Sequence, residues 1–160
     1  AIVEQRLLDP GKEMEALGDL AGGADCVLID APCSGVGTWR RKPEAKWRLN
    51  PKRLEQFAAT QDYLLALGAR LVKPGGRLVF VTCSLLDEEG ADRFGAFLQG
   101  HAIWRAEMLD LPLGRARGQG FRLSPFHDGT DGFSSQGPTC RVNLSPYARL
   151  RASNPGQIEG

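Results

Sequence analysis

The sequence lacks the signatures of several protein classes. Its four cysteines form no CxxC pair and show no zinc-ligand spacing, which argues against a structural metal site. No apolar run approaches the roughly 20 residues of a membrane-spanning helix, and no signal-peptide pattern is present. Neither sign of charge is in excess, since the net charge is +1. We therefore expect a cytoplasmic protein with reduced thiols, no metal ion and no membrane contact.

Also missing is a Gly-rich turn between a strand and a helix, followed about 20 residues later by a carboxylate. That pattern marks the first half of many nucleotide-binding folds. The 160 residues are enough for one domain with a core, and they begin with a predicted strand over residues 2–8 that ends at Asp9. The first residues of the sequence therefore match the middle of such a fold and not its beginning.

The stretch from Asp30 to Gly37 is the centre around which the sequence is organised. An apolar run just before it predicts a strand over 25–30 that is buried on both faces, with Cys26 in the core. A proline and two glycines then predict a sharp turn. In open α/β sheets, ligands bind at the carboxyl ends of the strands. Asp30 and Cys33 are therefore predicted to lie at a binding edge.

A second cysteine ends the next predicted strand. A cap residue and a proline mark the start of a helix over 51–73, and the apolar strand over 77–83 that follows it ends in Cys83. If the two strands are neighbours, they lie about 4.8 Å apart, and we expect the sulfurs of Cys33 and Cys83 within about 10 Å of each other. A disulfide and two chance core cysteines are the competing interpretations.

Residues 39–53 form a basic segment with interleaved tryptophans. Seven cations face one acid here, a local balance of +6 that leaves −5 for the rest of the chain. Cations attract phosphates whatever the sequence, and flat aromatic rings stack on unpaired bases. We therefore predict contact with a nucleic acid, and the alternative is a solvated basic loop with the tryptophans packed beneath it. The predicted contacts are Arg40, Arg41, Lys46, Trp47 and Arg48.

The C-terminal third has less regular patterns. A helix over roughly 87–99 is predicted to bury Phe94 and Phe97, and a strand is predicted within 102–107. From residue 134 onward, small and polar residues dominate without a period, which predicts a disordered or atypical tail over 134–160. The predicted fold class is α/β, with residues 1–133 forming part of a doubly wound parallel sheet.

Two thiols, a carboxylate and a basic aromatic surface suit one chemistry in particular. A thiolate can add to C6 of a pyrimidine, which makes C5 electron-rich and able to attack an electrophilic methyl group. A carboxyl group at N3 or at the exocyclic amine would favour that addition, and a second thiol could help remove the C5 proton or expel the first thiol. The base has to leave its stack to be reached, which the basic segment could assist.

Three motifs carry a resemblance to a known family. These motifs are Asp30-Ala31-Pro32-Cys33-Ser34-Gly35, Arg40-Arg41-Lys42-Pro43 and Thr82-Cys83-Ser84. With them the sequence resembles the RNA (cytosine-5) methyltransferases of the Sun/Fmu type, the family that includes enzymes similar to ribosomal RNA small-subunit methyltransferase B. The resemblance runs from about Ile2 to Phe133. It implies a partial Rossmann-like domain, the second half of a doubly wound parallel sheet, that uses S-adenosylmethionine to methylate ribosomal or transfer RNA.

The matching motifs also imply roles for individual residues. Cys83 would be the nucleophile, and Cys33 would assist its release. Asp30 would contact the target base and lie close to the cofactor. Asp9, at the end of the first predicted strand, matches the acidic position near the adenine of the cofactor.

The chain departs from the family pattern at two places, and two other functions stay open. The family's Gly-rich cofactor loop lies upstream of these residues, and Ser134-Ser135-Gln136-Gly137-Pro138 stands where the family has an apolar strand. A DNA cytosine-5 methyltransferase would use Cys33 as its nucleophile and leave Cys83 unexplained. A non-catalytic RNA-binding fragment would bind RNA without the cofactor.

Overall fold

The computed structural model describes residues 4–107 and 112–142, and for residues 136–142 it describes the backbone alone. The helices, with η marking a 3-10 helix, are α1 (Glu13–Leu17), η1 (Gly18–Leu20), η2 (Val36–Thr38), η3 (Pro43–Arg48), α2 (Pro51–Leu71), η4 (Asp87–Glu89), α3 (Ala91–Gly100) and α4 (Pro125–Asp128). The strands are β1 (Ala24–Asp30), β2 (Val72–Thr82), β3 (Trp104–Glu107), β4 (Arg115–Arg117), β5 (Gly120–Leu123) and β6 (Phe133–Val142). No helix in these ranges is long and apolar enough to cross a bilayer.

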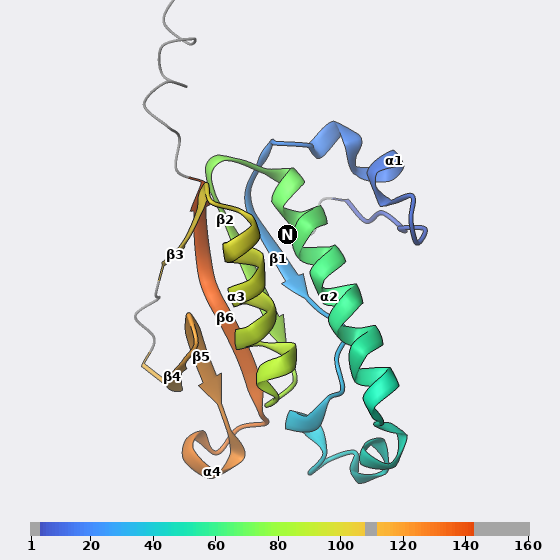
Figure 1. Cartoon of the computed structure of the whole chain (residues 1–160), viewed down its shortest axis with the longest axis vertical. Helices are drawn as coiled ribbons and strands as arrows, with labels where there is room; N and C mark the ends of the chain where they lie inside the picture. Colours follow the sequence, from blue (N-terminus) through green and yellow to red (C-terminus); the bar gives the residue numbers. More distant parts are fainter. Residues whose placement is uncertain (1–3, 108–111, 143–160) are drawn as a thin grey trace, which may run out of the picture.

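The strands form one mixed sheet in the order β1-β2-β6-β5-β4, with β3 also paired to β6 (Figure 1). β1 and β2 are parallel, and α2 connects them. This is the strand-helix-strand unit that the sequence predicts, and it confirms the predicted α/β class. β6 runs antiparallel to its neighbours β2, β3 and β5. The carboxyl ends of β1 and β2 therefore meet at one edge of the sheet.

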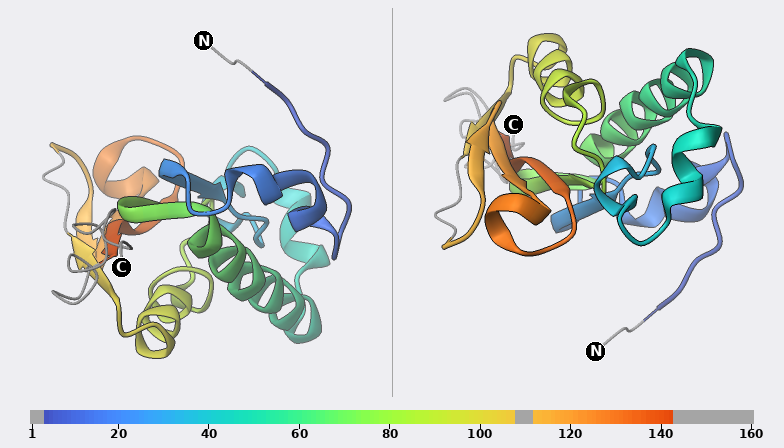
Figure 2. Two further views of the ribbon diagram at one scale, coloured as in Figure 1. Left: turned by 90° about the horizontal axis from the view of Figure 1, so that it is seen from above. Right: turned by 90° about the horizontal axis from the view of Figure 1, so that it is seen from below.

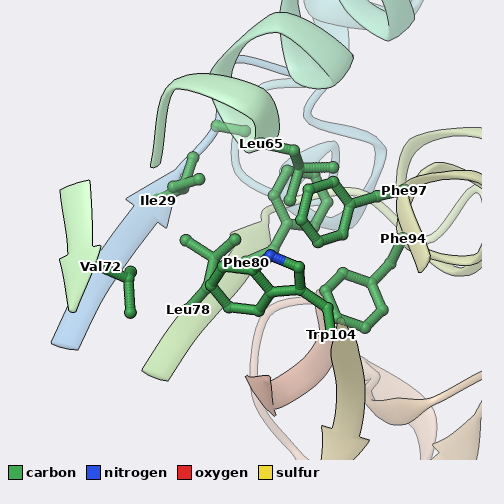
Figure 3. Packing of buried hydrophobic residues seen from close by; sticks show 9 residues of the cluster. Ile29, Leu65, Val72, Leu78, Phe80, Phe94, Phe97 and Trp104 are labelled. Atoms are coloured by element: carbon green, nitrogen blue, oxygen red, sulfur yellow. The ribbon is translucent and has the colours of Figure 1, made fainter. Parts of the chain in front are cut away.

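The helices α2 and α3 lie on the same side of the sheet, and the core lies between them and the strands (Figures 1 and 2). Leu78 and Phe80, which alternate along β2, are fully buried there. Phe94 and Phe97 of α3 are buried as predicted and pack near Trp104 (Figure 3). Phe97 and Trp104 meet edge to face, with ring centroids 5.7 Å apart. This cluster holds the two parallel strands in place.

The opposite face of β1 is open within the described residues. Leu28 is 66% exposed and Cys26 is exposed as well. The prediction that this strand is buried on both faces, with Cys26 in the core, is therefore wrong. Because both helices cover the other side, only alternating residues such as Ile29 reach the core, as in a sheet with one covered face.

The start of α2 is as predicted, and its end comes slightly early. The side-chain oxygen of Asn50 accepts a hydrogen bond of 2.9 Å from the Arg53 backbone N–H, which caps the helix before Pro51. α2 ends at Leu71, and β2 begins at the next residue instead of at residue 77. The extra residues join the strand with a shift of register, because Ala24 pairs with Val72 and Cys26 pairs with Arg77.

The single helix predicted over 87–99 is two helices. The short 3-10 turn η4 is separated from α3 by Gly90, whose φ of −135° and ψ of −96° are not helical. α3 then continues to Gly100. The break matters for the site described below, because it lets Glu89 turn into the protein interior.

The two ends of the chain depart most from prediction. Residues 4–8 form no strand, Leu7 is 92% exposed, and the segment runs away from the sheet (Figure 2). A strand needs a neighbour for its backbone hydrogen bonds, and the described strands offer this segment none. Residues 134–142, predicted to belong to a disordered tail, form most of β6, because pairing with β2 on one side and β3 and β5 on the other satisfies their backbone. Residues 1–3 and 143–160 lie outside the described residues.

Candidate active site

The two predicted cysteines meet at the carboxyl ends of the parallel strands. β1 ends at Asp30 and β2 at Thr82, so Cys33 and Cys83 each lie just beyond a strand end. The backbone N–H of Ala31 extends the pairing by donating to the Val81 carbonyl at 2.9 Å. The two sulfurs are 3.3 Å apart, and both side chains are half-buried free thiols. Their predicted proximity is confirmed, and they are not joined in a disulfide.

The serines that follow the two cysteines face each other in the same way. The hydroxyl oxygens of Ser34 and Ser84 are 3.3 Å apart, and the Ser84 oxygen accepts a hydrogen bond of 3.1 Å from the Leu86 backbone N–H. Glu89 closes this arrangement from η4. One of its carboxylate oxygens accepts the Ser34 backbone N–H at 2.7 Å, and the other accepts the Ser34 hydroxyl. We call Cys33, Ser34, Cys83, Ser84 and Glu89 the thiol site.

Backbone contacts fix the loop that carries Cys33. Gly37 donates its N–H to the Cys83 carbonyl at 3.0 Å and accepts from the Gly132 N–H at 2.8 Å. The approach is so close that a Cβ on Gly37 would lie 2.0 Å from the Gly132 carbonyl oxygen. Gln61, fully buried on α2, donates to the Pro32 carbonyl at 2.9 Å. The loop is therefore held from β2, from α2 and from the start of β6.

The surroundings of Cys33 favour its neutral form. Burial is the main cause, and with the hydrogen bond to Cys83 it raises the pKa of the Cys33 thiol to about 12. The negative charge of Glu89 acts in the same direction, while a backbone hydrogen bond at Gly35 opposes it. Cys33 is thus a protonated thiol at neutral pH, and a group in that state donates a hydrogen bond or a proton rather than attacking as a thiolate.

A cavity of about 130 Å³ opens beside Cys33, between its loop, η3 and the first turns of α2. Arg48, Arg53 and Phe57 line it together with Cys33 and Ser34. A thiol, two guanidinium groups and an aromatic ring therefore surround one small space. Such a lining suits a flat ring attached to a phosphate, because the ring can contact Phe57 while the cations face the phosphate.

The two predicted cofactor carboxylates are both exposed. Asp30 lies at the last position of β1, where its Cα is opposite Val81, two residues before Cys83. Asp9 lies in the turn before α1, where its carbonyl accepts the Lys12 N–H at 2.9 Å. Because residues 4–8 are not a strand, Asp9 is not at a strand end as predicted. Asp30 joins the thiol edge by register, and no contact joins Asp9 to it in the described structure.

The basic segment adjoins the thiol site and is mostly exposed. Arg40 and Arg41 both face Asp131, with Arg40 Nη2 3.5 Å from an Asp131 carboxylate oxygen. Both guanidinium groups remain more than half exposed, whereas Asp131 is largely buried. Asp131 belongs to the segment before β6, so this pairing ties the basic segment to the loop that contacts Gly37. Of the predicted cations, Arg48 lines the cavity, and Arg40 and Arg41 have part of their charge balanced by Asp131.

The two tryptophans of the basic segment differ. Trp47 is 80% exposed, and the Lys46 ammonium lies 4.5 Å from the centre of one of its rings. Trp39 is half-buried, and its indole N–H has no hydrogen-bond partner among the described residues. The alternative interpretation, in which both tryptophans pack beneath the loop, therefore holds at most for Trp39. Trp47 presents a free aromatic face.

Sequence reasoning missed three residues that shape the site. Glu89 and Gln61 are buried polar side chains, and Asp131 pairs with the basic segment. Glu89 lies in an acidic run of three residues, which in a sequence is typical of a solvated turn. Gln61 falls on the face of α2 that periodicity assigns to the core, and a polar residue there is a signal that could have been followed. Across residues 4–107 and 112–142, no cluster of three or more His, Cys, Asp or Glu is arranged to hold a metal ion.

Comparison with known proteins gives one consistent result. The family model described as 16S rRNA methyltransferase RsmB/F matches residues 10–136. Ribosomal RNA small subunit methyltransferase B of Thermus thermophilus is 43% identical over 129 residues, which are 80% of this chain and 29% of that protein. The protein of the same name from Erwinia tasmaniensis is 38% identical over 68% of this chain and 24% of its own length. The chain thus spans between 24% and 29% of these relatives.

Solved structures agree on the fold. PH0851 is 36% identical and superposes with a TM-score of 0.68 over 75% of this chain and 27% of its own. A methyltransferase homologue from Pyrococcus horikoshii is 28% identical, with a TM-score of 0.58 over 75% of this chain and 40% of its own. NSun6 from the same organism, solved with SFG, is 23% identical and superposes with a TM-score of 0.62. The match covers 74% of this chain and 30% of NSun6. The described residues therefore form part of a Rossmann-like fold, as predicted.

Proposed function

Because the chain belongs to the 16S rRNA methyltransferase RsmB/F family, we propose that the full protein methylates C5 of a cytosine in ribosomal RNA with S-adenosylmethionine. The observation that carries this proposal is the 3.3 Å contact between the sulfurs of Cys33 and Cys83 at the ends of two parallel strands. Chance core cysteines have no reason to meet at a strand edge beside an exposed carboxylate. In this proposal the protein acts in the cytoplasm, where ribosomal RNA is its substrate, and transfer RNA is the alternative substrate.

Cys83 is the nucleophile in this proposal. Its sulfur adds as a thiolate to C6 of the cytosine, and the ring electrons displaced by the new bond make C5 nucleophilic. S-adenosylmethionine, when bound, supplies the electrophilic methyl group. Loss of the C5 proton to a base restores the C5–C6 double bond and expels the sulfur of Cys83. Cys33 assists this release, because its thiol is within hydrogen-bond distance of the departing sulfur.

The residues present fit part of the cofactor. The exposed carboxylate of Asp30 lies at the carboxyl edge of β1, where parallel sheets of this class bind ligands. A carboxylate there can accept hydrogen bonds from the amino group of the cofactor or from the exocyclic amine of the base. Asp9 is exposed and free to accept from the adenine end. The cavity beside Cys33 is suited to the target base rather than to the cofactor, because cations line it.

The basic segment supplies the RNA surface. Arg40, Arg41 and Lys46 attract phosphates, and Trp47 offers an aromatic face on which an unpaired base can stack. Arg48 reaches the cavity itself, so it joins the surface to the thiol site. A base that leaves its stack is thereby held close to the thiols.

Trapping the covalent intermediate tests the assignment of the two thiols. In the full protein with S-adenosylmethionine and substrate RNA, Cys33→Ala should allow addition and methyl transfer and then stall with RNA attached through Cys83. Cys83→Ala should give no adduct and no turnover. A denaturing gel separates the slowly migrating adduct from free protein. The matched control is Cys26→Ala, which removes an exposed thiol on the open face of β1 and should leave turnover unchanged.

The same gels distinguish the alternatives. Adduct in Cys83→Ala and none in Cys33→Ala would reverse the roles and favour the mechanism of a DNA cytosine-5 methyltransferase. Absence of methyl transfer by the unaltered full protein, with RNA binding retained, would favour a non-catalytic RNA-binding function. Calorimetric titration with S-adenosylmethionine completes the test, because a full protein that does not bind the cofactor cannot carry out the proposed reaction.

A further inference from the structure

Glu89 is a charged side chain in an unusual place. It is fully buried, although burying an unpaired carboxylate costs several kcal/mol. It comes from η4, which follows Cys83 in the chain, yet both of its oxygens accept hydrogen bonds from Ser34, which follows Cys33. Within residues 4–107 and 112–142, no Lys, Arg or His forms an ion pair with it. One residue therefore links the two cysteine-bearing segments and keeps a negative charge inside the site.

We propose that Glu89 is a positioning residue that clasps Ser34 and thereby holds Cys33 beside Cys83 as the S–H donor of the pair. This inference rests on the proposed function, because it specifies which thiol serves which step. Glu89 is not among the residues that line the cavity beside Cys33. Glu89 acts through Ser34 and through its charge.

The hydrogen-bond geometry supports the proposal that Glu89 positions the chain next to Cys33. Two hydrogen bonds to a single residue, one from its backbone and one from its hydroxyl, fix both the place and the orientation of the chain next to Cys33. The Ser34 hydroxyl also meets Ser84, so the clasp reaches the residue next to Cys83. The two sulfurs are then brought to 3.3 Å without a covalent bond. A neutral acceptor such as glutamine can receive one of these bonds but presents an amide N–H to the other donor.

The charge of Glu89 supports the proposal that Cys33 donates its S–H. The groups that face Cys33 are Cys83 from the end of β2, Glu89 from η4, and Arg48 and Arg53 across the cavity. Burial raises the pKa of Cys33 most, followed by the bond to Cys83, and the Glu89 charge adds to the same direction. Cys33 is therefore held in its protonated form, with its sulfur within hydrogen-bond distance of Cys83. On this ground, Cys33 is the proposed donor of the contact.

Site-resolved alkylation of the thiols tests this inference without RNA or cofactor. The chain is treated with iodoacetamide between pH 7 and 10.5, and peptide mass spectrometry gives the rate at each cysteine. Unaltered protein should show slow alkylation of Cys33, because only the thiolate reacts. Glu89→Gln should raise the Cys33 rate at pH 9 about threefold, because the Glu89 charge is the smallest of the causes that raise this pKa. Cys26, which is exposed and outside the site, is the internal standard.

Two matched variants separate charge from packing. Ser34→Ala removes one hydrogen bond to Glu89 but keeps the charge and the backbone N–H bond, so the Cys33 rate should stay close to that of the unaltered protein. Glu89→Asp keeps the charge and should restore slow alkylation at least in part. Equal acceleration in Glu89→Gln and Ser34→Ala, or no acceleration in Glu89→Gln, would overturn the proposal. Retained circular dichroism confirms that each variant is folded.

A measurement on the unaltered chain covers the case in which Glu89→Gln does not fold. The ¹³Cβ shift of Cys33 reports its protonation directly, and it should keep the thiol value up to pH 10. Titration of Cys33 below that pH would overturn the donor assignment. The outcome is independent of the proposed function, because a chain that fails to form an RNA adduct can still show a protonated Cys33, and the reverse also holds.

Discussion

The thiol site and the basic segment share one cavity but are built in different ways. At the thiol site, side chains are buried or half-buried, and each one is hydrogen-bonded to another residue of the site. In the basic segment, most side chains are exposed, and the ion pairs of Arg40 and Arg41 with Asp131 are solvent-accessible on the arginine side. A buried network fixes positions to within a bond length, whereas exposed cations adapt to what they bind.

This difference matches the two tasks that the proposed reaction sets. Bond formation at a ring carbon requires a sulfur held in one place, and small displacements of reacting atoms are costly. Binding of an RNA backbone requires positive charge over an area, with tolerance for the path of the strand. Substitutions in the two regions should therefore have different consequences. Changes at the thiol site should lower stability and disturb geometry, and changes in the basic segment should lower affinity alone.

The largest effect is expected from Gly37→Ala, which disturbs the buried loop that carries Cys33. The added Cβ would lie 2.0 Å from the Gly132 carbonyl oxygen, so the backbone has to move and the bond to the Cys83 carbonyl is lost. We expect a loss of about 3 kcal/mol in unfolding free energy, the upper end for overpacking. Urea denaturation measures it. Gly95→Ala on α3, where nothing lies within 4 Å of a Cβ, is the control and should stabilise by about 0.5–1 kcal/mol.

Changing Arg40, Arg41 and Lys46 together to glutamine tests whether the exposed basic segment determines RNA affinity. The slope of log affinity against log salt should fall in magnitude by about 2, at roughly 0.7 per phosphate contact. Affinity for RNA should fall about tenfold, because Asp131 already balances part of the charge on the two arginines. Unfolding free energy should change by less than about 0.5 kcal/mol. Filter binding at several salt concentrations gives both values.

A charge-matched control accompanies that triple variant. Lys12, Lys73 and Arg77 are exposed cations at the other end of the molecule, before α1 and at the start of β2. Changing these three to glutamine should leave the salt slope nearly unchanged. An equal loss in both triple variants would mean that net charge, and not the place of the basic segment, determines RNA affinity.

Trp47→Ala should give a smaller loss, confined to binding. The ring is 80% exposed, so its removal should leave stability unchanged. Stacking on an unpaired base contributes about 1 kcal/mol at the lower end of the usual range, which corresponds to about fivefold in affinity. Trp47→Phe, which keeps an aromatic face, should retain most of the binding. Fluorescence titration with a single-stranded RNA measures both variants, and equal affinity for Ala and Phe would remove Trp47 from the RNA surface.

An effect as small as that of Trp47→Ala is expected at Gln61, which helps to hold the loop of Cys33. Gln61→Leu removes the donor to the Pro32 carbonyl, and leaving that group unpaired costs about 1–3 kcal/mol. The substitution also removes a buried amide oxygen that has no partner, which offsets part of the loss. We therefore expect a net loss of about 1 kcal/mol by urea denaturation. Gln56→Leu, on an exposed turn of the same helix, is the control and should be close to neutral.

Elements whose pattern is local were predictable from the sequence. The strand before Asp30, the capped start of α2 and the burial of Phe94 and Phe97 follow from apolar spacing and cap chemistry, which neighbouring residues set. The proximity of Cys33 and Cys83 followed as well. Two consecutive strands joined by a helix pair in parallel, and residues just beyond their ends then meet at one edge.

The tertiary structure decided whatever depends on residues distant in sequence. Polar residues 134–142 form a strand because β2, β3 and β5 satisfy their backbone, whereas residues 4–8 form none because no described strand lies beside them. In the sequence, the acidic run that contains Glu89 is typical of a solvated turn. In the structure, both of its carboxylate oxygens accept hydrogen bonds from Ser34, 55 positions away. The residue types that perform the chemistry are thus present in local motifs. Which of them are buried, paired and protonated depends on the contacts that folding creates.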